Sequence, residues 1–273
     1  MTSSSDYENQ YLRLVADLGG VLRDKCVQLY SCRFSRQDYT VHQHIILLVL
    51  RSKERKPYRD FCQWLGVASE VCEALDLRQV PHYTTLQKQA SRLPPGFLEA
   101  LMAWIGLSKI QKSEIVAIDG TGFSLDFSSH HYCQRIGRKD KHRNYLKTSI
   151  TAEVNDQILI GARCRLKRRH DNHDFAPLMR KTRKRLKFET LVADKGYDSE
   201  DNLEFVEDEL HATPIIPPKY ADKPPDKTRG TRRTKLKLHF PIEKYSHRNK
   251  IESIISVVKR KYGSTIYSRT HRT

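Results

Sequence analysis

The chain of 273 residues is long enough for one medium-sized catalytic domain and a smaller accessory domain. Hydrophobic residues make up 38% and charged residues 30%, a polar composition that still provides for a core. The 49 Lys and Arg residues exceed the 32 Asp and Glu residues, so the net charge is +17. This excess favours a polyanionic partner, because each cation that neutralises a phosphate releases a counterion. Charge alone leaves a solvated basic surface open, and it does not separate DNA from RNA or an anionic membrane.

Other features exclude several classes of protein. The six cysteines form no Cys-x-x-Cys pair, which argues against a zinc ribbon. The first residues lack the charged-then-apolar layout of a signal peptide, and the longest aliphatic run, residues 45–50, is too short to span a bilayer. We therefore expect a cytoplasmic protein with reduced thiols and no membrane partner.

Residues 1–110 are predicted to form a helical domain. One expected helical face collects four side chains, Tyr58, Phe61, Cys62 and Leu65. A later helix is expected to begin after Pro81, with Thr84 or Thr85 as its N-cap. A basic helical module of this kind is typical of a DNA-binding helix-turn-helix, and a packing domain without DNA contacts is an equally weighted alternative.

Residues 111–273 mix strand and helix patterns. Strands are predicted at 115–118, 123–127, 148–154, 157–166, 191–193 and 213–216, and helices at 175–186, 199–210 and 244–262. A sharp bend is expected at residues 120–122 and a hairpin turn at Asn155-Asp156. Residues 217–240 carry four prolines and eight Lys or Arg and are predicted to form a mobile basic loop. This order predicts an α/β fold, a mixed sheet with helices packed on it.

The predicted last helix carries a polar stripe. Its members, at offsets of 0, 3, 7 and 14 residues, are Tyr245, Arg248, Glu252 and Lys259. Isoleucines and valines occupy the other faces and are expected to pack on the sheet. A carboxylate between two cations suits phosphodiester chemistry, because the carboxylate can hold a metal ion while the cations contact phosphate oxygens.

Two aspartates stand where predicted strands end. Asp119 follows the strand at 115–118 and Asp194 follows the strand at 191–193. Open α/β sheets bind ligands at the carboxyl ends of their strands. If Glu252 converges with these aspartates, the three carboxylates can hold two Mg²⁺ ions about 3.5–4 Å apart, which clamp an in-line displacement at phosphorus. Hard oxygen ligands favour Mg²⁺ or Mn²⁺ over zinc.

These residues resemble three motifs of the IS4/IS5-type insertion-sequence DDE transposases. The string Tyr245-x2-Arg248-x3-Glu252-x6-Lys259 resembles the Y-R-E-K signature of that family. AIDGTGF around Asp119 resembles its first-Asp motif, and ADKGYDSEDN around Asp194 resembles its second. The three motifs stand in the family's order and cover residues 114–262, while the N-terminal third is similar less specifically.

The resemblance implies an RNase H-like fold for residues 111–273 and DNA binding by residues 1–110. It implies three catalytic residues that hold two Mg²⁺ ions, with Mn²⁺ as a substitute: Asp119, Asp194 and Glu252. It also implies three DNA-contacting residues: Tyr245, Arg248 and Lys259. The implied activity is strand cleavage at transposon ends and strand transfer into double-stranded target DNA, by a homodimer that holds both ends, in a prokaryotic cytoplasm.

Several residues have simpler alternatives. Asp119 and Asp194 each precede residues typical of turns, and Glu252 alone would be a solvated helix residue. Asp198 rivals Asp194 as a ligand, and we interpret it as a turn and capping residue ahead of a helix capped by Ser199.

Two charged segments also allow more than one interpretation. Residues 170–174, with the sequence HDNHD, suit a metal hydrolase, but partner motifs are absent, so we interpret them as a polar loop with Asp174 as a helix N-cap. The block at 163–187 carries eleven Lys or Arg and is predicted to be a phosphate track rather than a solvated face.

Two other functions stay open. One is a catalytically inactive, DNA-binding transposase remnant, and the other is an RNase H-like nuclease acting on RNA or hybrids. Members of the family usually carry a further helix or more beyond the last motif, whereas 14 residues follow Lys259 here. This difference leads us to expect a C-terminal truncation and motivates the inactive alternative.

Overall fold

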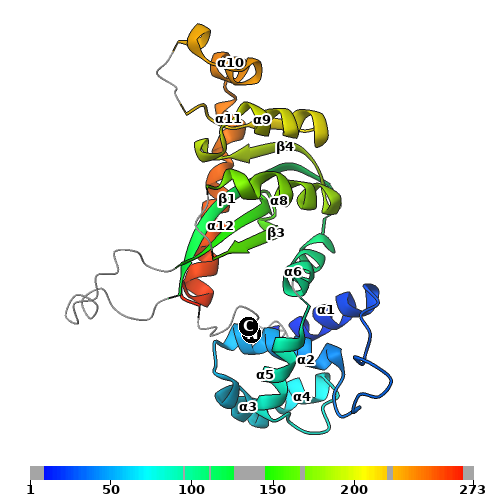
Figure 1. Ribbon diagram of the computed structural model, residues 1–273. Helices are drawn as coiled ribbons and strands as arrows, with labels where there is room; N and C mark the ends of the chain where they lie inside the picture. Colours follow the sequence, from blue (N-terminus) through cyan, green and yellow to red (C-terminus); the bar gives the residue numbers. More distant parts are fainter. Residues whose placement is uncertain are drawn as a thin grey trace, which may run out of the picture. The chain divides into compact units, whose positions relative to one another are not determined.

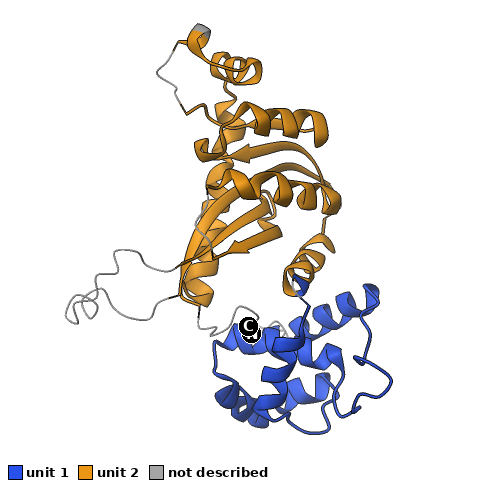
Figure 2. Ribbon diagram, viewed as in Figure 1, with its two compact units in different colours: residues 1–97, 268–273 blue, residues 98–267 orange. Residues whose placement is uncertain are grey.

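The computed structural model describes residues 9–94, 96–110, 112–125, 145–166, 170–219 and 224–266. The chain divides into two compact units, one formed by residues 1–97 and 268–273 and the other by residues 98–267 (Figure 2). None of the helices in these described ranges combines the length and apolar character needed to cross a membrane.

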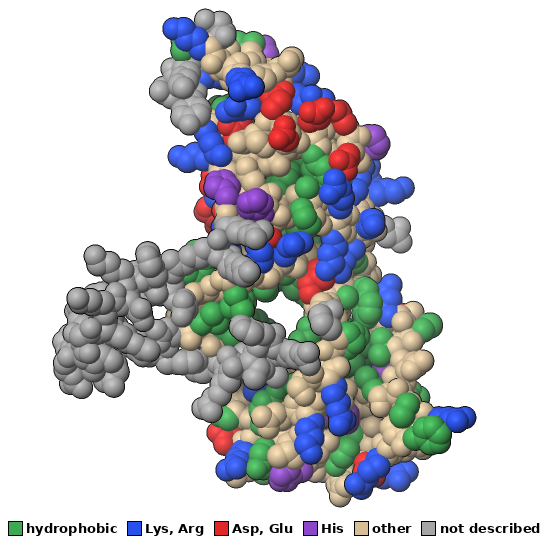
Figure 3. All heavy atoms as spheres, viewed as in Figure 1, with side chains coloured by type: hydrophobic (Ala, Val, Ile, Leu, Met, Phe, Trp, Pro, Cys, Tyr) green, Lys and Arg blue, Asp and Glu red, His purple; other side chains and the backbone are tan. Residues whose placement is uncertain are grey.

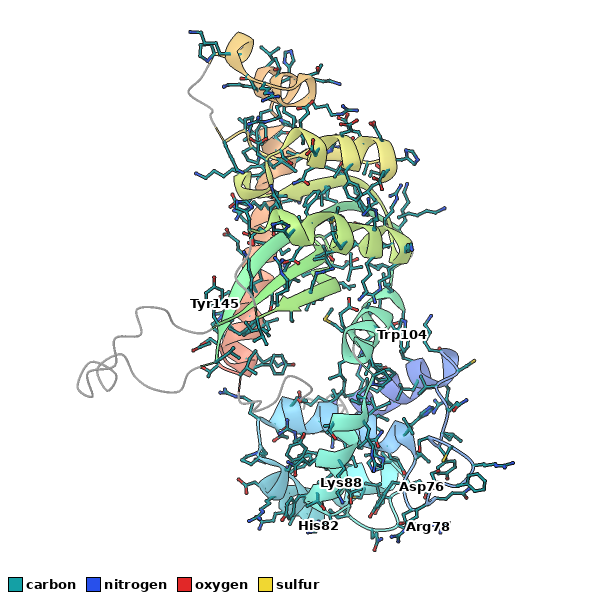
Figure 4. All side chains as sticks on the ribbon, viewed as in Figure 1. Asp76, Arg78, His82, Lys88, Trp104 and Tyr145 are labelled. Carbon is teal, nitrogen blue, oxygen red and sulfur yellow. The ribbon has the colours of Figure 1, made fainter. Side chains whose placement is uncertain are left out.

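The first unit is built from helices: α1 (Gln10–Asp24), α2 (Val41–Glu54), α3 (Tyr58–Val67), α4 (Ser69–Ala74) and α5 (Tyr83–Arg92). The predicted face of α3 is confirmed, since Phe61 and Leu65 are fully buried. The predicted threonine N-cap of α5 is wrong. His82 caps this helix, and its ring nitrogen accepts the backbone N–H of Thr84 (Figure 4).

The second unit contains the sheet. Its strands are β1 (Lys112–Ser124), β2 (Tyr145–Glu153), β3 (Ile158–Arg165), β4 (Lys187–Ala193) and β5 (Thr213–Ile215). Its longer helices are α6 (Phe97–Leu107), α8 (Asn172–Arg185), α10 (Thr231–Leu238) and α12 (Arg248–Tyr262). Its shorter turns and helices are η1 (Lys195–Tyr197), α9 (Glu200–Glu204), the π-helical η2 (Phe205–Glu209), η3 (Pro225–Lys227) and α11 (Ile242–Ser246).

The five strands lie in the order β3-β2-β1-β4-β5. β2 runs antiparallel to both of its neighbours, whereas β1, β4 and β5 are parallel. The predicted hairpin turn at Asn155-Asp156 joins β2 to β3. This topology confirms the predicted α/β class and has the strand order of an RNase H-like sheet.

Helices cover both faces of the sheet (Figure 1). Side chains alternate along β1, so Val116 and Ile118 join the core beneath α8 and α9, while Ile115 and Ala117 join the core beneath α12. The three isoleucines that α12 buries in that core are Ile251, Ile254 and Ile255.

Three predictions for the second unit are wrong. β1 passes through residues 120–122 without a bend, because β2 pairs with it as far as Ser124 and Tyr145. The predicted loop at 217–240 contains η3 and the helix α10, while its residues 220–223 lie outside the described ranges. The predicted last helix is two helices, separated at His247.

Candidate active site

The two motif aspartates lie where β1 and β4 part. Their parallel pairing ends with Ile118 opposite Ala193, and the next residues of the two strands are Asp119 and Asp194. Asp194 therefore ends its strand as predicted, whereas Asp119 lies inside the longer β1. Side-chain alternation turns Asp119 toward the α12 face, the side also taken by Ala117.

The segment after α12 returns to β1 beyond this fork. Ser124 donates its N–H to the carbonyl of Ser264 at 2.8 Å and accepts the N–H of Ile266 at 2.8 Å. Between Ile118 and Ser124, this edge of β1 has no strand partner among the described residues. The fork thereby leaves an opening at the end of the sheet, beside Asp119.

Backbone amides fix the two aspartate side chains in the same way. An Asp119 carboxylate oxygen accepts the N–H of Gly120 at 2.7 Å, and an Asp194 carboxylate oxygen accepts the N–H of Lys195 at 2.7 Å. Each carboxylate keeps its second oxygen for another partner.

Arg248 and Glu252 reach the opening from α12. The isoleucines of α12 bury its inner face, which leaves Arg248 and Glu252 one turn apart at the sheet end. Arg248 Nη1 lies 2.8 Å from Glu252 Oε1, and Arg248 Nη2 lies 3.7 Å from Asp119 Oδ2. The guanidinium therefore stands between carboxylates that belong to different elements.

Burial and the neighbouring charges shift the pKa values of Asp119 and Arg248. Burial raises the pKa of Asp119, and Glu252 and Asp194 raise it further, against the opposing effects of the Gly120 amide and Arg248. Burial lowers the pKa of Arg248, but Asp119, Glu252 and Asp194 outweigh this effect and leave that pKa raised. The carboxylates of Asp119, Glu252 and Asp194 thus all favour the charged form of Arg248.

An open pocket of about 500 Å³ adjoins these groups. Its lining includes Asp119, Gly120, Glu252, Lys259, Arg260 and Ser264. The ammonium of Lys259 lies 5.5 Å from the centre of the Phe123 ring, so the lysine stands beside β1. The pocket thus combines carboxylates and cations in its lining, and such a combination suits a phosphodiester and a cation together.

Tyr245 lies on α11 rather than on the helix of Glu252, contrary to the prediction. Its ring packs edge-on against Phe240 at 5.2 Å. Burial raises the pKa of Tyr245, and although Arg248 lowers it, Asp194, Glu252 and Asp119 raise it further. All three carboxylates therefore act electrostatically on the Tyr245 phenol. The predicted site residues thus lie in one region of the second unit.

The chemistry of the three carboxylates, from Asp119, Asp194 and Glu252, suits a hard divalent cation. Carboxylate oxygens are the ligands that Mg²⁺ and Mn²⁺ prefer. Among the described residues, no three His, Cys, Asp or Glu side chains stand close enough together to hold a metal ion. The Arg248 guanidinium occupies the space between the carboxylates of Asp119 and Glu252.

Asp198 makes contacts that the sequence did not predict. Its buried carboxylate is bidentate with Arg233 and accepts the N–H of Lys219 at 2.9 Å. These partners occupy Asp198, which favours Asp194 over its rival as a ligand. The predicted N-cap role of Ser199 is confirmed, since its hydroxyl accepts the N–H of Asn202.

Asp174 is also different from its prediction. α8 begins at Asn172, and Asp174 is fully buried with Arg163 at 2.9 Å, Arg165 at 2.6 Å and Ser149 at 3.1 Å. It is therefore not an N-cap, and its oxygens serve guanidinium groups, which also disfavours the metal-hydrolase interpretation.

The basic block at 163–187 is largely paired within the protein. Arg163 and Arg165 bind Asp174, Arg180 binds Glu209, Lys181 and Arg185 bind Glu99, and Arg183 donates to the carbonyl of Phe188. Residues 167–169 lie outside the described ranges. The predicted phosphate track stays a prediction, and these six cations would have to share or exchange their internal partners to meet phosphates.

Comparisons with known proteins point to one family. The family model described as the transposase DDE domain matches residues 110–272. Among solved structures, the chain is similar to the piggyBac transposase in a synaptic complex with hairpin DNA, with 10% identity and a TM-score of 0.38. That similarity covers 81% of this chain and 54% of the other, so the chain spans about half the length of that protein. A search of curated proteins finds no match.

Proposed function

Because the chain belongs to the transposase DDE domain family, we propose that it cuts and joins DNA with Asp119, Asp194 and Glu252. The observation that supports this proposal is that Asp119 of β1 and Glu252 of α12 both face the Arg248 guanidinium, while Asp194, just after the end of β4, acts electrostatically on the same groups. The motifs further favour an insertion-sequence transposase of the IS4/IS5 type.

The three carboxylates would hold two Mg²⁺ ions, with Mn²⁺ as a substitute. When bound, such ions activate the attacking oxygen and stabilise the leaving oxygen of an in-line displacement at phosphorus. The proposed reaction has two steps. Water cleaves a phosphodiester at a transposon end and frees a 3′-hydroxyl. This hydroxyl then attacks a target phosphodiester, so that it is joined to the target 5′-phosphate while a target 3′-hydroxyl leaves.

The remaining site residues act on the DNA. Arg248 releases Glu252 and Asp119 and pairs with a phosphate, for which its planar fork is suited. Lys259 neutralises a second phosphate at the wall of the pocket. Tyr245 supplies an aromatic surface and a hydroxyl that can donate to a phosphate oxygen. Two transposon ends have to be held together, so we propose a homodimer as the active complex.

We propose that the helical unit binds double-stranded DNA through α5. This helix buries only Leu86 and exposes Gln87 and Lys88, which leaves a polar face for the grooves (Figure 4). Lys88→Ala is expected to weaken duplex binding about equally for all sequences, as expected for a phosphate contact. The measurement is fluorescence anisotropy with a labelled duplex. If the Lys88→Ala variant bound the duplex as tightly as the wild type, the proposed DNA contact of α5 would be contradicted.

Replacement of Glu252 tests the proposed chemistry. Glu252→Gln is expected to lower Mg²⁺-dependent nicking of transposon-end DNA by at least about 10³-fold while DNA affinity stays within about two-fold. Glu243→Gln on α11 is the matched control, because Glu243 is exposed and outside the pocket. Full cleavage by Glu252→Gln would overturn the proposal.

The wild-type protein distinguishes the two alternatives in the same assay. Tight binding to transposon ends without nicking in Mn²⁺ would favour an inactive remnant. Degradation of RNA–DNA hybrids without any need for an end sequence would favour a nuclease.

A further inference from the structure

α10 is fastened to the elements that follow the second-Asp motif. The Arg232 guanidinium lies 2.7 Å from Glu207 and 2.8 Å from Asp208, both on η2. The Glu200 carboxylate accepts the backbone N–H groups of Arg232 at 2.8 Å and Arg233 at 3.2 Å, so it caps the start of α10. Figure 3 shows the acidic side chains gathered over α9 and η2, next to the basic side chains of α10.

Arg233 reaches deeper than Arg232. Its Nε and Nη2 atoms lie 2.9 and 2.6 Å from the two carboxylate oxygens of Asp198, a bidentate pair. The Asp198 side chain is only 1% exposed, and that of Arg233 is 17% exposed. A carboxylate buried to this degree depends on its cation, because its charge is poorly solvated.

Asp198 closes the turn that begins at Asp194. Within this turn Tyr197 donates its N–H to the carbonyl of Asp194 at 2.9 Å, and Asp198 donates its N–H to the carbonyl of Lys195 at 3.1 Å. The Asp198 carboxylate also accepts the N–H of Lys219, so it ties the turn to the segment after β5. A shift of Asp198 would therefore move the turn that carries the Asp194 carboxylate.

We propose that Arg233 is a positioning residue that sets the Asp194 carboxylate through Asp198. The inference rests on the proposed function, in which Asp194 is a metal ligand. Residues that orient ligand-bearing segments typically change metal affinity or activity by about 10–100-fold when they are lost. The helix α10 thus contributes to the chemistry without touching the pocket, whose lining residues all lie outside it.

Arg232 is a matched control for Arg233. Both arginines lie on the same helix and both pair with carboxylates, but the partners of Arg232 lie on η2, outside the Asp194 turn. Loss of Arg232 weakens the docking of α10 in general, whereas loss of Arg233 also removes the cation from Asp198. Arg233→Lys keeps the charge and loses the bidentate geometry, so it serves if Arg233→Ala does not fold.

Two measurements on the full chain test the proposal. The first is amide hydrogen exchange of the peptide covering residues 194–198, and the second is Mn²⁺ binding to the protein without DNA. Arg233→Ala is expected to speed exchange at least about ten-fold and to weaken Mn²⁺ binding about 10–100-fold, with Arg233→Lys in between. Arg232→Ala is expected to stay within about three-fold of the wild type in both.

The outcomes separate this inference from the proposed function. Folded Arg233 variants with unchanged exchange and Mn²⁺ binding would overturn the positioning role. Equal effects of Arg232→Ala and Arg233→Ala would overturn it too, because general undocking of α10 would then suffice. A wild-type protein that binds no Mn²⁺ either alone or with duplex DNA would contradict the proposed function, while the exchange comparison still decides whether Arg233 holds the turn.

Discussion

Two glycines beside Asp119 leave different amounts of room for a side chain. Gly120 follows Asp119, and a Cβ there would lie 3.4 Å from the Asp171 carboxylate and 3.7 Å from the Tyr197 hydroxyl, on the sheet face opposite Asp119. Gly122 leaves room for the ring of Tyr145 on β2, which would lie 3.1 Å from a Cβ (Figure 4). A side chain at position 122 would therefore press on the Tyr145 ring, whereas an alanine at position 120 would make ordinary contacts.

Gly230 is the glycine whose replacement should be most costly. Its φ of 102° disfavours side chains, and a Cβ would overlap the Glu200 carboxylate that caps α10. We expect Gly230→Ala to destabilise the protein by about 2 kcal/mol, from backbone strain and loss of the cap. The measurement is urea-induced unfolding followed by circular dichroism.

The control for this prediction is Gly120→Ala, whose Cβ would make ordinary contacts. We expect that variant to stay within about 1 kcal/mol of the wild type. Equal stability of the Gly230→Ala variant and the wild type would show that Glu200 does not hold α10 in solution.

At the scale of elements, charged side chains connect helices to the sheet. Glu99 on α6 receives hydrogen bonds from Lys181 and from Arg185, the latter at 2.9 Å, and accepts the N–H of Ala162 on β3 at 3.2 Å. Burial raises the pKa of Glu99, but the hydrogen bonds from Arg185 and Lys181 outweigh it, so the pKa lies below its ordinary value. This cluster joins α6, α8 and β3.

The lowered pKa of Glu99 gives a pH-dependent stability. Because the folded state favours the charged carboxylate, its contribution is complete above the unfolded-state pKa and is lost as the pH falls through the folded-state pKa. Glu99→Gln is expected to lower the free energy of unfolding by about 1 kcal/mol at pH 7, discounted for partial solvent access. The difference between this variant and the wild type should begin to shrink as the pH falls to about 4.3, the ordinary glutamate pKa, and should vanish only once the folded-state carboxylate is protonated too.

Urea unfolding of both proteins at several pH values checks this prediction. The half-exposed pair of Arg180 and Glu209 supplies a control, since Glu209→Gln is expected to cost less than about 0.5 kcal/mol. A Glu99→Gln effect that does not change with pH would mean that the charge of Glu99 is not the stabilising feature.

Local sequence patterns predicted most helices and strands. The features that they did not predict depend on contacts between distant parts of the chain. The hairpin turn at Asn155-Asp156 and the end of β4 at Asp194 follow from turn chemistry and side-chain alternation, which act over a few residues. The bend predicted at residues 120–122 failed because β2 holds β1 straight from another part of the chain. Likewise, the local sequence indicates Asp174 as a helix cap, but its partners, Arg163 and Arg165, lie on β3 and only the fold brings them to it.

The candidate site shows the same division. The motifs indicated Asp119, Asp194 and Glu252, but no local pattern indicates that Arg248 bridges two of these carboxylates across elements. The roles of these residues stay predictions until they are tested. Asp198 and Arg233 are 35 residues apart, so only the folded chain brings them together.

At the scale of the whole molecule, the charge of +17 is the dominant property. Figure 3 shows Lys and Arg side chains spread over the visible face of both units. Many cations of the 163–187 block are paired internally, so we expect the proposed DNA contacts to involve other cations, among them Lys259, Arg260 and Lys261 in the last turn of α12. Charge of this kind produces affinity that depends steeply on salt.

Duplex binding without divalent metal should therefore weaken sharply with KCl. We expect the logarithm of the association constant to fall against the logarithm of salt concentration with a slope of roughly −5 or steeper. Lys259→Ala should reduce the magnitude of that slope by about 1. Fluorescence anisotropy titrations at several salt concentrations between about 50 and 200 mM give the slope. A slope near zero would contradict a phosphate-led interface.

The central claim is that Asp119, Asp194 and Glu252 together ligate the catalytic metal ions. A crystal structure of the protein with Mn²⁺ and DNA, with anomalous scattering used to locate manganese, tests it most directly. We predict manganese about 2.1–2.2 Å from carboxylate oxygens of all three residues, with Arg248 moved onto a phosphate. Manganese bound elsewhere, with Arg248 still paired to Glu252, would contradict the claim.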